Sequence, residues 1–388
     1  MKNISRLILN GAQKSNLCWC ILRKEDEIIA GIENDIDIFV SSCDYHSFLK
    51  HLREYFFEHN LVILRERRMP AGTSYLLGQL TFPFETEKLD IIYENTLTFI
   101  SIISSDLIIQ NIVPGESYPV LSAEVSADLS VRKERARSSI SNYVSYLVSD
   151  LKSGRGWPKL VPFRYLKAFL FNSRKPSGVF VVLVGPDGSG KTTVAESLIR
   201  KGKNSFFSVS LFHFSIPTFP RLAKLLGRGS REPDYTLPNS GTSAPIQSKS
   251  RALIYTIYYG LELFFYSHLR LRRRLRQGEL VIFDRYLHDW MFQRSYRNMS
   301  RPAIRWLLSR SVSPELVVYL TGNPVEINFR KPELSVSEIS YQQTLIESDL
   351  MPFWEGRGVT TVKLSSTALT VDEIVKMILN KLTRNIHE

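Results

Sequence analysis

The clearest candidate for chemistry is the stretch from Val179 to Thr193, which reads VFVVLVGPDGSGKTT. Gly185 is followed, after four residues, by Gly190-Lys191-Thr192, a spacing typical of a loop that binds phosphate groups. The glycines of this loop let backbone N–H groups approach phosphate oxygens without an intervening Cβ. An apolar strand precedes the loop and a helical segment, TVAESLIR, follows it. An ordinary glycine-rich turn would not explain why lysine and threonine both fall in register.

The polar residues of this loop fit a nucleotide and its metal ion. The helix that follows the loop points its positive end at the same anion. Lys191 is expected to reach the terminal phosphates, and the hydroxyl of Thr192 to ligate Mg²⁺. We therefore predict ATP and Mg²⁺ as cofactors. The residues predicted to bind the nucleotide are Gly185, Asp187, Gly188, Ser189, Gly190, Lys191, Thr192 and Thr193.

A second group of chemical residues follows a later apolar run. Leu280-Val281-Ile282-Phe283 leads directly into Asp284, Arg285 and Tyr286. An acid at the tip of a strand beside the phosphate loop can orient Mg²⁺ or its water shell. The neighbouring arginine can pair bidentately with a phosphate. We expect Asp284 to be a metal residue and Arg285 to hold phosphate.

Three acids in the first half of the chain could also serve phosphate chemistry. Asp35 and Asp37 alternate with isoleucines in the sequence DIDIFV, so both carboxylates leave the same face of a strand. Asp90 lies on a second predicted strand, KLDIIY. Together these acids could hold a divalent metal. In the alternative interpretation, Asp35 and Asp37 lie on the solvent side of an edge strand.

The composition is that of a globular protein with anionic ligands. The chain has 388 residues, enough for two domains, of which 44% are apolar and 23% charged. A formal net charge of +12 suits phosphate-bearing partners but does not separate nucleotides from nucleic acid or an anionic membrane. Three cysteines cannot form a disulfide framework, and no His/Cys set has zinc spacing. Together with an N-terminal apolar run too short for a signal peptide, these features predict a cytoplasmic protein.

The longest apolar stretch, Ala252 to Leu269, is interrupted by Glu262 and His268. It favours a core helix over a membrane-surface helix, and no transmembrane segment is predicted. The basic run that follows, 270–276, places its arginines around leucines at helical spacing, without interleaved aromatic residues. Nucleic acid is therefore not expected as a partner.

Five apolar strand candidates organise the second half of the chain, at 179–184, 208–214, 280–284, 316–320 and 359–364. Continuously apolar strands that alternate with helices predict a five-stranded parallel sheet covered on both faces. A ligand then binds at the carboxyl ends of the strands, where the phosphate loop already lies. The fold class is α/β in this half, preceded by an α+β domain with a helix predicted from Asp44 to His59.

Glycine and proline residues mark a boundary between the two halves. The segment SGRGWPKLVPFRYLKAFLFNSRKPSG carries them at both ends of a short aromatic stretch. We predict a first domain over residues 1–152, a linker over 153–177 and a second domain over 178–388.

The two motifs of the second half resemble those of the thymidylate kinase family of P-loop kinases, over about residues 178–388. The family's loop carries the Asp-Gly-x-Gly-Lys-Thr-Thr seen here from Asp187 to Thr193, and its second motif is the Asp-Arg-Tyr at 284–286. The resemblance implies that Asp187 touches the acceptor's sugar hydroxyl and that Arg285 holds its phosphate. It also implies a basic lid, a role assigned to Arg330 and Lys331, which could instead form a solvated helix end. The residues expected to act in catalysis are Lys191, Asp284, Arg285 and Arg330.

Departures from that family concern the acceptor. A long basic segment at 212–250 replaces a compact connection, and further arginines follow the Asp-Arg-Tyr motif. Those arginines could grip a more highly charged acceptor or form surface salt bridges. The chain looks like divergent bacterial relatives of thymidylate kinase, some found with polysaccharide biosynthesis functions. The residues expected to contact the acceptor are Asp187, Arg285, Tyr286, Arg294, Arg297 and Lys331.

The first half resembles the nucleotidyltransferase superfamily, whose mark is an Asp-x-Asp strand after a Gly-Ser turn and a third Asp on a later strand. Asp35, Asp37 and Asp90 match those acids, and the resemblance implies that they bind metal. The Gly-Ser pair is missing ahead of Asp35, where only Gly31 stands. In the family that turn grips the nucleotide triphosphate, so its absence weighs against catalysis.

The leading hypothesis is an enzyme that transfers the γ-phosphoryl group of ATP·Mg²⁺ to a nucleotide or sugar-type acceptor. A regulatory protein that binds ATP and controls a partner through its first domain is an alternative, as is nucleotidyl transfer by Asp35, Asp37 and Asp90. A homodimer is compatible with these features.

Overall fold

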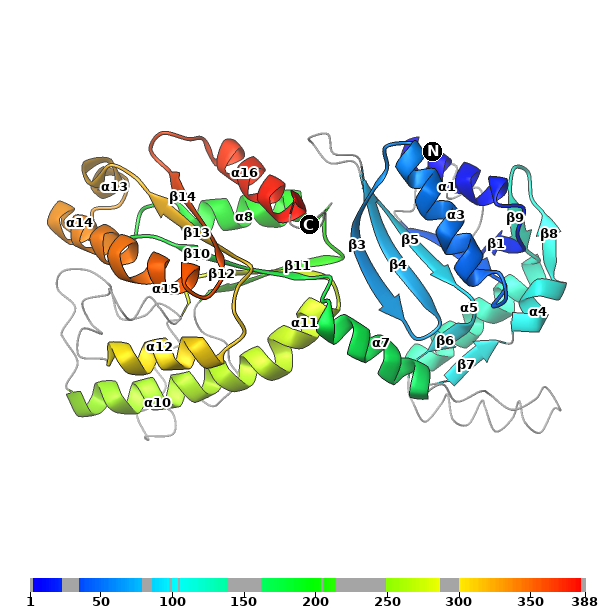
Figure 1. The fold of residues 1–388 in the computed structure, drawn as a ribbon, viewed down its shortest axis with the longest axis horizontal. Coiled ribbons are helices and arrows are strands. Elements are labelled where there is room, and N and C mark those ends of the chain that lie inside the picture. The colour runs from blue at the N-terminus through cyan, green and yellow to red at the C-terminus, as the bar shows by residue number, and fades with distance from the viewer. Residues whose placement is uncertain are drawn as a thin grey trace. The chain divides into compact units, whose positions relative to one another are not determined.

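The computed structural model describes residues 3–22, 35–78, 86–97, 100–103, 105–138, 162–203, 205–213, 249–286 and 300–384. The chain divides into two compact units, Met1–Pro176 and Ser177–Glu388 (Figure 1). Each unit contains one large sheet, and the candidate site residues of that unit lie on its strands or on the segments that follow them.

The described strands of the first unit form a mixed seven-stranded sheet and a separate pair. They are β1 (Trp19–Ile21), β2 (Asp35–Val40), β3 (Val62–Met69), β4 (Gly72–Gly78), β5 (Thr86–Ile92), β6 (Asn95–Leu97), β7 (Ile100–Ile103), β8 (Ile112–Pro114) and β9 (Pro119–Leu121). The order in the large sheet is β3-β4-β5-β2-β1-β9-β8, and β6 pairs with β7. β2 runs parallel to β5 and β1 to β9, while the other neighbours are antiparallel.

Alternation along β2 directs its side chains to the two faces of this sheet. Ile36 and Ile38 are buried on one face, and Asp35 and Asp37 leave the other. Helices α1 (Asn3–Lys14) and α3 (Tyr45–Glu58) add apolar side chains, including Ile8 and Phe48, to the same core. The short helix α4 (Ser105–Gln110) and the helix α5 (Ala123–Ser138) pack on the opposite face, around Phe39.

The predicted linker contains a helix. Residues Pro162–Arg174 form α7, which contacts strand β3 within the first unit. Gly and Pro lie at the ends of this segment, but the residues between them form a helix that places Ala168 and Asn172, four residues apart, on a buried side. The first part of the predicted linker, 153–161, lies outside the described residues.

The second unit contains, within its described residues, the parallel five-stranded sheet expected from the sequence. The strands are β10 (Val179–Val184), β11 (Ser208–His213), β12 (Glu279–Asp284), β13 (Leu316–Thr321) and β14 (Thr360–Ser365). Their order is β11-β12-β10-β13-β14, and every neighbouring pair is parallel. β10, which leads into the predicted phosphate loop, is the central strand and lies next to β12, which ends at Asp284.

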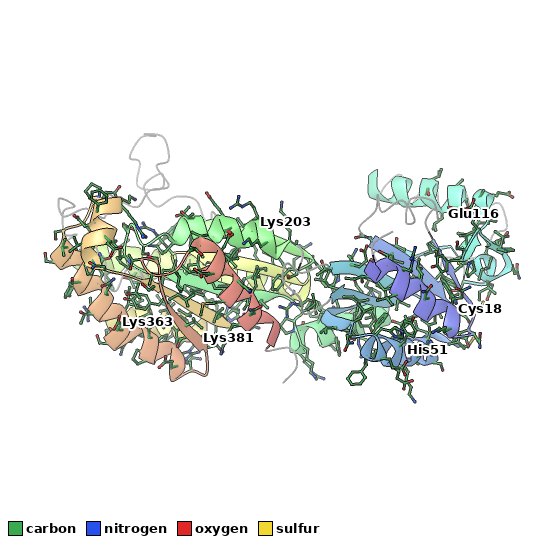
Figure 2. The ribbon with its side chains drawn as sticks, turned by 90° about the horizontal axis from the view of Figure 1, so that it is seen from above. Cys18, His51, Glu116, Lys203, Lys363 and Lys381 are labelled. Atoms are coloured by element: carbon green, nitrogen blue, oxygen red, sulfur yellow. The ribbon has the colours of Figure 1, made fainter. Side chains whose placement is uncertain are left out.

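Helices cover both faces of this sheet (Figure 1). On one face lie α8 (Lys191–Gly202) and α16 (Val371–Arg384), which contact each other. On the other lie α10 (Lys249–Tyr266), α12 (Arg301–Arg310) and α15 (Met351–Glu355), which share a core with β10 and β12. The same unit contains α13 (Pro324–Arg330) and α14 (Val336–Leu345). Seen from above, Lys203 follows α8, Lys363 lies on β14 and Lys381 on α16 (Figure 2).

The apolar stretch 252–269 lies mostly in α10, and a π-helical turn, Ser267–Leu271, joins it to α11 (Arg272–Arg276). One side of α10 is in the core, where Leu263 and Tyr266 are buried. The other side exposes large apolar residues such as Leu261 and Phe265, so the prediction of a core helix holds for one face only. Among the described helices, none is long and apolar enough to cross a membrane.

Candidate active site

Residues 185–190, the predicted phosphate loop, connect the end of β10 to the start of α8. We call this segment the glycine loop. A Cβ on Gly185 would lie 2.4 Å from the backbone oxygen of Leu320 on β13, so a larger residue would push the two neighbouring strands apart. Gly190 has a φ of +84°, a conformation that side-chain-bearing residues avoid. The sequence spacing is therefore matched by a tight turn that leads directly into a helix N-terminus.

Lys191 lies at the first position of α8 and is 6% exposed. Its Nζ donates hydrogen bonds to the backbone oxygens of Gly185, at 2.8 Å, and Pro186, at 2.9 Å. The same Nζ is 3.7 Å from Oδ1 of Asp187. The ammonium group is thus held within the loop, where it stands beside the backbone groups that would face a phosphate.

Thr192 and Asp284 come together across two neighbouring strands. Leu183 on β10 is in register with Asp284 on β12, and the next residues of β10 enter the loop. Thr192 Oγ1 donates to Asp284 Oδ2 at 2.7 Å. Mg²⁺ prefers oxygen ligands, and in nucleotide sites it is usually held by one or two protein groups together with substrate phosphates. This hydroxyl and carboxylate therefore fit a Mg²⁺ ion bound with a nucleotide.

Arg285 has a backbone conformation that is unusual for a residue with a side chain. Its φ is +82°, in the left-handed region, at the end of β12. Its guanidinium Nη2 forms a hydrogen-bonded ion pair with Oδ1 of Asp187. Backbone strain of this kind tends to persist where the side chain must be placed for function. The turn directs Arg285 at the glycine loop, as its sequence position led us to expect.

Tyr286, by contrast, is not at the site. It is 1% exposed and packs edge-to-face against Phe180 and Phe283, with ring centroids 5.5 and 5.3 Å away. Burial raises the pKa of its hydroxyl far above the ordinary tyrosine value. The turn at Arg285 sends the next side chain back into the core, so the prediction of an acceptor contact for Tyr286 is not supported by its position.

A cavity of about 400 Å³ joins these residues to a part of the chain that sequence reasoning missed. The glycine loop, Arg285, Arg330 and Lys331 line one part of it. Ser366 and Leu369, from the loop between β14 and α16, line another, with Val371 and Ile374 of α16. Two sequence signals were available for this loop: it follows the last parallel strand, and Thr370 and Glu373 form a helix-capping box.

The lid residues lie at the rim of this cavity. Arg330 Nη1 donates to the backbone oxygen of Ser366 at 3.1 Å, and Lys331 Nζ pairs with Glu333 Oε2 at 3.1 Å. Both residues end or follow the short helix α13. Their role over a transferring phosphate stays a prediction. Arg294 and Arg297, and almost all of the segment 212–250, lie outside the described residues.

The three acids of the first unit share one face of the sheet. Asp37 on β2 is in register with Asp90 on β5, and Asp35 with Lys88. Lys88 Nζ lies 3.1 Å from Asp35 Oδ2 and 3.2 Å from Asp90 Oδ2, between the two carboxylates. The hydroxyl of Ser74 on β4 also donates to Asp90.

A lysine lies between two of these acids in this structure. An ammonium group takes the position between Asp35 and Asp90 where a cation would bind. Over the described parts of the chain, no group of three or more His, Cys, Asp or Glu residues is placed to hold a metal ion. Lys88 follows the same alternation as the acids and reaches the same face, so it forms an ion-paired cluster with Asp35 and Asp90 in this structure. Metal binding by Asp35, Asp37 and Asp90 stays a prediction. Gly31 and Glu33 lie outside the described residues.

The basic run 270–276 belongs to a helix packed on the sheet. Leu271 and Leu275 are buried, and Arg274 Nη1 pairs with Glu279 Oε1 at 2.7 Å. The guanidinium group of Arg274 also lies 5.0 Å from the ring centre of Phe212. The helical spacing noted in the sequence is therefore explained by packing of the leucines.

Comparisons with known proteins find likeness at the level of structure alone. No protein-family model matches the chain, and no curated protein matches its sequence. Among solved structures, the chain is similar to a thymidylate kinase from Ehrlichia chaffeensis, with 15% identity and a TM-score of 0.35 over 53% of this chain and 100% of that one. It is also similar to a thymidylate kinase from Candida albicans, with 20% identity and a TM-score of 0.37 over 54% of this chain and 94% of that one. At this level of likeness, the chemistry of the site must follow from its own residues and distances.

Proposed function

We propose that the second unit is a P-loop phosphotransferase resembling thymidylate kinase. It would transfer the γ-phosphoryl group of ATP to a nucleotide or sugar-type acceptor. The observation that carries this proposal is the meeting of the glycine loop with Asp284 and Arg285 at the carboxyl ends of adjacent parallel strands. An ordinary turn would need neither the bond from Thr192 to Asp284 nor the strained backbone of Arg285.

ATP binding is supported by the loop and by the start of α8. Backbone N–H groups at a helix N-terminus attract phosphate oxygens, and glycines allow close approach. The ammonium group of Lys191 now contacts the backbone oxygens of Gly185 and Pro186. A bound triphosphate would offer it stronger, charged acceptors in the same place. The apolar side chains of Leu369, Val371 and Ile374 in the same cavity suit the base of the nucleotide.

Thr192 and Asp284 would hold the Mg²⁺ ion that accompanies ATP. When bound, that ion neutralises charge on the terminal phosphates. Asp284 is 3% exposed and lies at the end of β12, next to the central strand β10. The hydrogen bond to Thr192 keeps the two oxygen ligands side by side.

Arg285 and Asp187 are placed to receive the acceptor. An acceptor phosphate would compete with Asp187 for the guanidinium group, and the released carboxylate could then accept a hydrogen bond from an acceptor hydroxyl. In the transfer, an acceptor oxygen forms the new bond to the γ-phosphorus while the bond from that phosphorus to ADP breaks. Positioning and charge neutralisation by Lys191, Arg285 and Arg330 would suffice, without a covalent intermediate.

ADP release from ATP·Mg²⁺ tests the proposal. The full-length protein would be assayed against thymidylate, other nucleoside monophosphates, common sugars and sugar phosphates. We expect at least one acceptor to raise turnover many-fold, and Lys191→Ala to abolish the increase. Lys201→Ala is the matched control, because Lys201 lies on the same helix, outside the cavity lining, and pairs with the exposed Asp372 at 2.8 Å.

Two outcomes would count against the proposal. An acceptor-stimulated rate that survives in Lys191→Ala would place the chemistry elsewhere. Tight ATP binding with no stimulation by any acceptor would favour a regulatory ATP-binding protein.

A further inference from the structure

The first unit contains a cavity that none of the chemistry above uses. It has a volume of about 320 Å³ and lies between α3, the hairpin of β3 and β4, and α7. We call it the hairpin pocket. Thr73 lines it, whereas Ser74, the next residue on β4, contacts Asp90. Because successive strand residues point to opposite faces, the hairpin pocket and the acid cluster lie on opposite sides of the sheet.

Charge in the hairpin pocket is predominantly positive. Among the described residues that line it, the cationic side chains are those of Arg53, Arg68 and Lys167, and the carboxylate is that of Glu66. His46 adds an imidazole ring. A concave site with this balance favours an anionic ligand over a neutral or cationic one.

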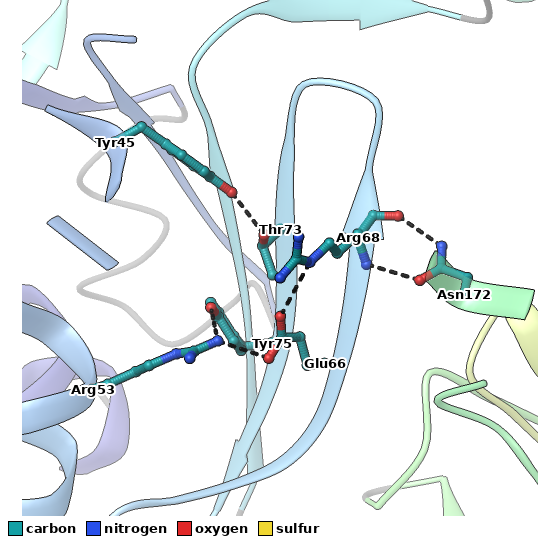
Figure 3. A network of polar contacts seen from close by, with 7 residues as sticks. All are labelled: Tyr45, Arg53, Glu66, Arg68, Thr73, Tyr75 and Asn172. Carbon is teal, nitrogen blue, oxygen red and sulfur yellow. Dashed lines mark hydrogen bonds and ion pairs between the residues drawn. The ribbon is translucent and has the colours of Figure 1, made fainter. Parts of the chain in front are cut away.

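The two arginines share Glu66 as a partner (Figure 3). Arg53 Nη2 lies 2.8 Å from Glu66 Oε2, and Arg68 Nε lies 3.7 Å from Glu66 Oε1. Each guanidinium group has five N–H donors, so one shared carboxylate uses only part of their capacity. Both arginine side chains are about half exposed, at 49% and 46%, and can reach a ligand in the cavity.

Hydrogen bonds hold the walls that carry these charges. Asn172 of α7 accepts a hydrogen bond from the backbone N–H of Arg68 at 3.1 Å and donates one to its backbone oxygen at 2.8 Å. These bonds tie α7 to the edge strand through the backbone, so they do not occupy the guanidinium group (Figure 3). On the other wall, the hydroxyls of Tyr45 and Thr73 are bonded at 2.7 Å, and Arg53 donates to the hydroxyl of Tyr75 at 3.2 Å.

The remaining lining suits a small ring with hydroxyl groups. Tyr45 and Tyr93 meet edge-to-face, with ring centroids 4.7 Å apart, and Leu49 and Pro70 add apolar surface. Glu66 is an acceptor for ligand hydroxyls, and Thr73 can accept or donate. A volume of about 320 Å³ is at the small end of ligand cavities.

We propose that the hairpin pocket binds a small phosphate ester of a sugar or polyol. Arg53, Arg68 and Lys167 hold the phosphate, and Glu66 accepts hydrogen bonds from hydroxyl groups. The hairpin pocket belongs to the first unit, whereas the glycine loop belongs to the second. The hairpin pocket gives the protein a second phosphate-recognising site, in the unit that carries the ion-paired acids.

Calorimetric titration of the full-length protein with ribose 5-phosphate tests the proposal, with ribose as the neutral comparator. We expect ribose 5-phosphate to bind and ribose not to bind. Arg68→Gln should weaken binding by about ten-fold or more, as expected for loss of a charged hydrogen bond. It leaves the backbone bonds to Asn172 in place. Lys167→Gln, a change on an exposed residue of α7, should weaken binding several-fold without affecting folding.

Two controls separate this site from the phosphate loop and from general charge effects. Lys50→Gln removes a positive charge from the same helix, α3, at a residue whose side chain is 80% exposed, and should leave binding unchanged. Lys191→Ala and Arg285→Ala, which remove the residues proposed to hold the phosphates of ATP and of the acceptor, should also leave it unchanged. The proposal is overturned if ribose 5-phosphate does not bind, if Lys191→Ala or Arg285→Ala abolishes the binding, or if Arg68→Gln and Lys167→Gln bind as the wild type does.

Discussion

At the scale of single residues, Arg285 shows a conflict between local preference and position. Its left-handed backbone is unfavourable for any residue with a Cβ, yet it aims the guanidinium group at Asp187. Glycine would adopt this conformation without strain. That arginine stands here suggests that its side chain is needed in the site.

Comparison of Arg285→Gly with Arg285→Ala separates backbone from side chain. Both variants lose the ion pair with Asp187 and should lose acceptor-stimulated ADP release by about a hundred-fold or more. The glycine variant should be more stable than the alanine variant by about 1 kcal/mol, because only alanine retains the left-handed strain. Urea unfolding and the ADP assay measure the two effects. Equal stability of the two variants would show that φ at this position is not strained.

Lys88 offers a second test at this scale. Burial acts to lower the pKa of Lys88, but the carboxylates of Asp90 and Asp35 outweigh it and raise the pKa. The bridging ammonium group is therefore charged at neutral pH. Its contribution to stability is complete below the ordinary lysine pKa and is lost only as the pH rises through the higher, folded-state value.

Removal of that ammonium group should expose a cation site. In Lys88→Ala, Asp35 and Asp90 would face each other without the counterion between them, so we expect the nucleotide-free protein to gain Mn²⁺ binding. Calorimetry with Mn²⁺ measures the gain, and Lys50→Ala, on exposed surface, is the control. Wild-type protein that already binds Mn²⁺ as tightly as Lys88→Ala would contradict the ion-paired interpretation.

At the scale of elements, α7 depends on one amide side chain. Asn172 is 8% exposed and forms both of its bonds with the backbone of Arg68 on the edge strand β3. An amide used in this way satisfies backbone groups that a neighbouring strand would otherwise pair. The guanidinium group of Arg68 also lies 4.0 Å from the ring centre of Phe171 on the same helix.

Asn172→Ala should therefore destabilise the first unit by about 1–3 kcal/mol, the range for leaving buried polar groups without partners. Ser173→Ala is the matched control, because its hydroxyl is exposed and bonds only to the oxygen of Phe169 within the same helix. Denaturant unfolding of the two variants gives the difference. Equal midpoints would mean that α7 is held by its apolar contacts alone.

Much of the second unit could be predicted from sequence, because its signals are local. Continuous apolar runs gave the strands, and the glycine spacing gave the loop and the start of α8. The burial of the Tyr286 side chain in the core could not be predicted, since it depends on the positive φ of the preceding residue, Arg285. Nor could the lining by Ser366 and Leu369, which depends on the order of strands in the sheet.

In the first unit, the sequence identified the right face but not its chemistry. Alternation placed Asp35, Asp37 and Asp90 together, and the structure has all three on one face. The same alternation applies to Lys88, two residues before Asp90. An ion pair across strands depends on which residues lie opposite each other in neighbouring strands. The alternation within one strand does not contain that information. The hairpin pocket could not be predicted either, because one of its walls is α7, a helix within the segment predicted as a linker.

At the scale of the whole molecule, we propose that two units with separate sheets each bind a phosphate-bearing ligand. A net charge of +12 is consistent with ligands that are anionic in both. The second unit has the residues for transfer, and the first has a cationic pocket without a metal centre among its described residues. We expect a variant at Lys191 to abolish phosphoryl transfer without affecting ligand binding in the hairpin pocket. A variant at Arg68 should weaken that binding without affecting phosphoryl transfer.

The most direct test of the central claim follows the γ-phosphoryl group itself. The full-length protein would be incubated with Mg²⁺, ATP labelled in its γ-phosphate and the acceptor panel, and the products separated by mass. The account predicts label in a phosphorylated acceptor with wild-type protein and Lys201→Ala, and none with Lys191→Ala. Label that appears only as inorganic phosphate, or a labelled acceptor that forms equally well in Lys191→Ala, would contradict it.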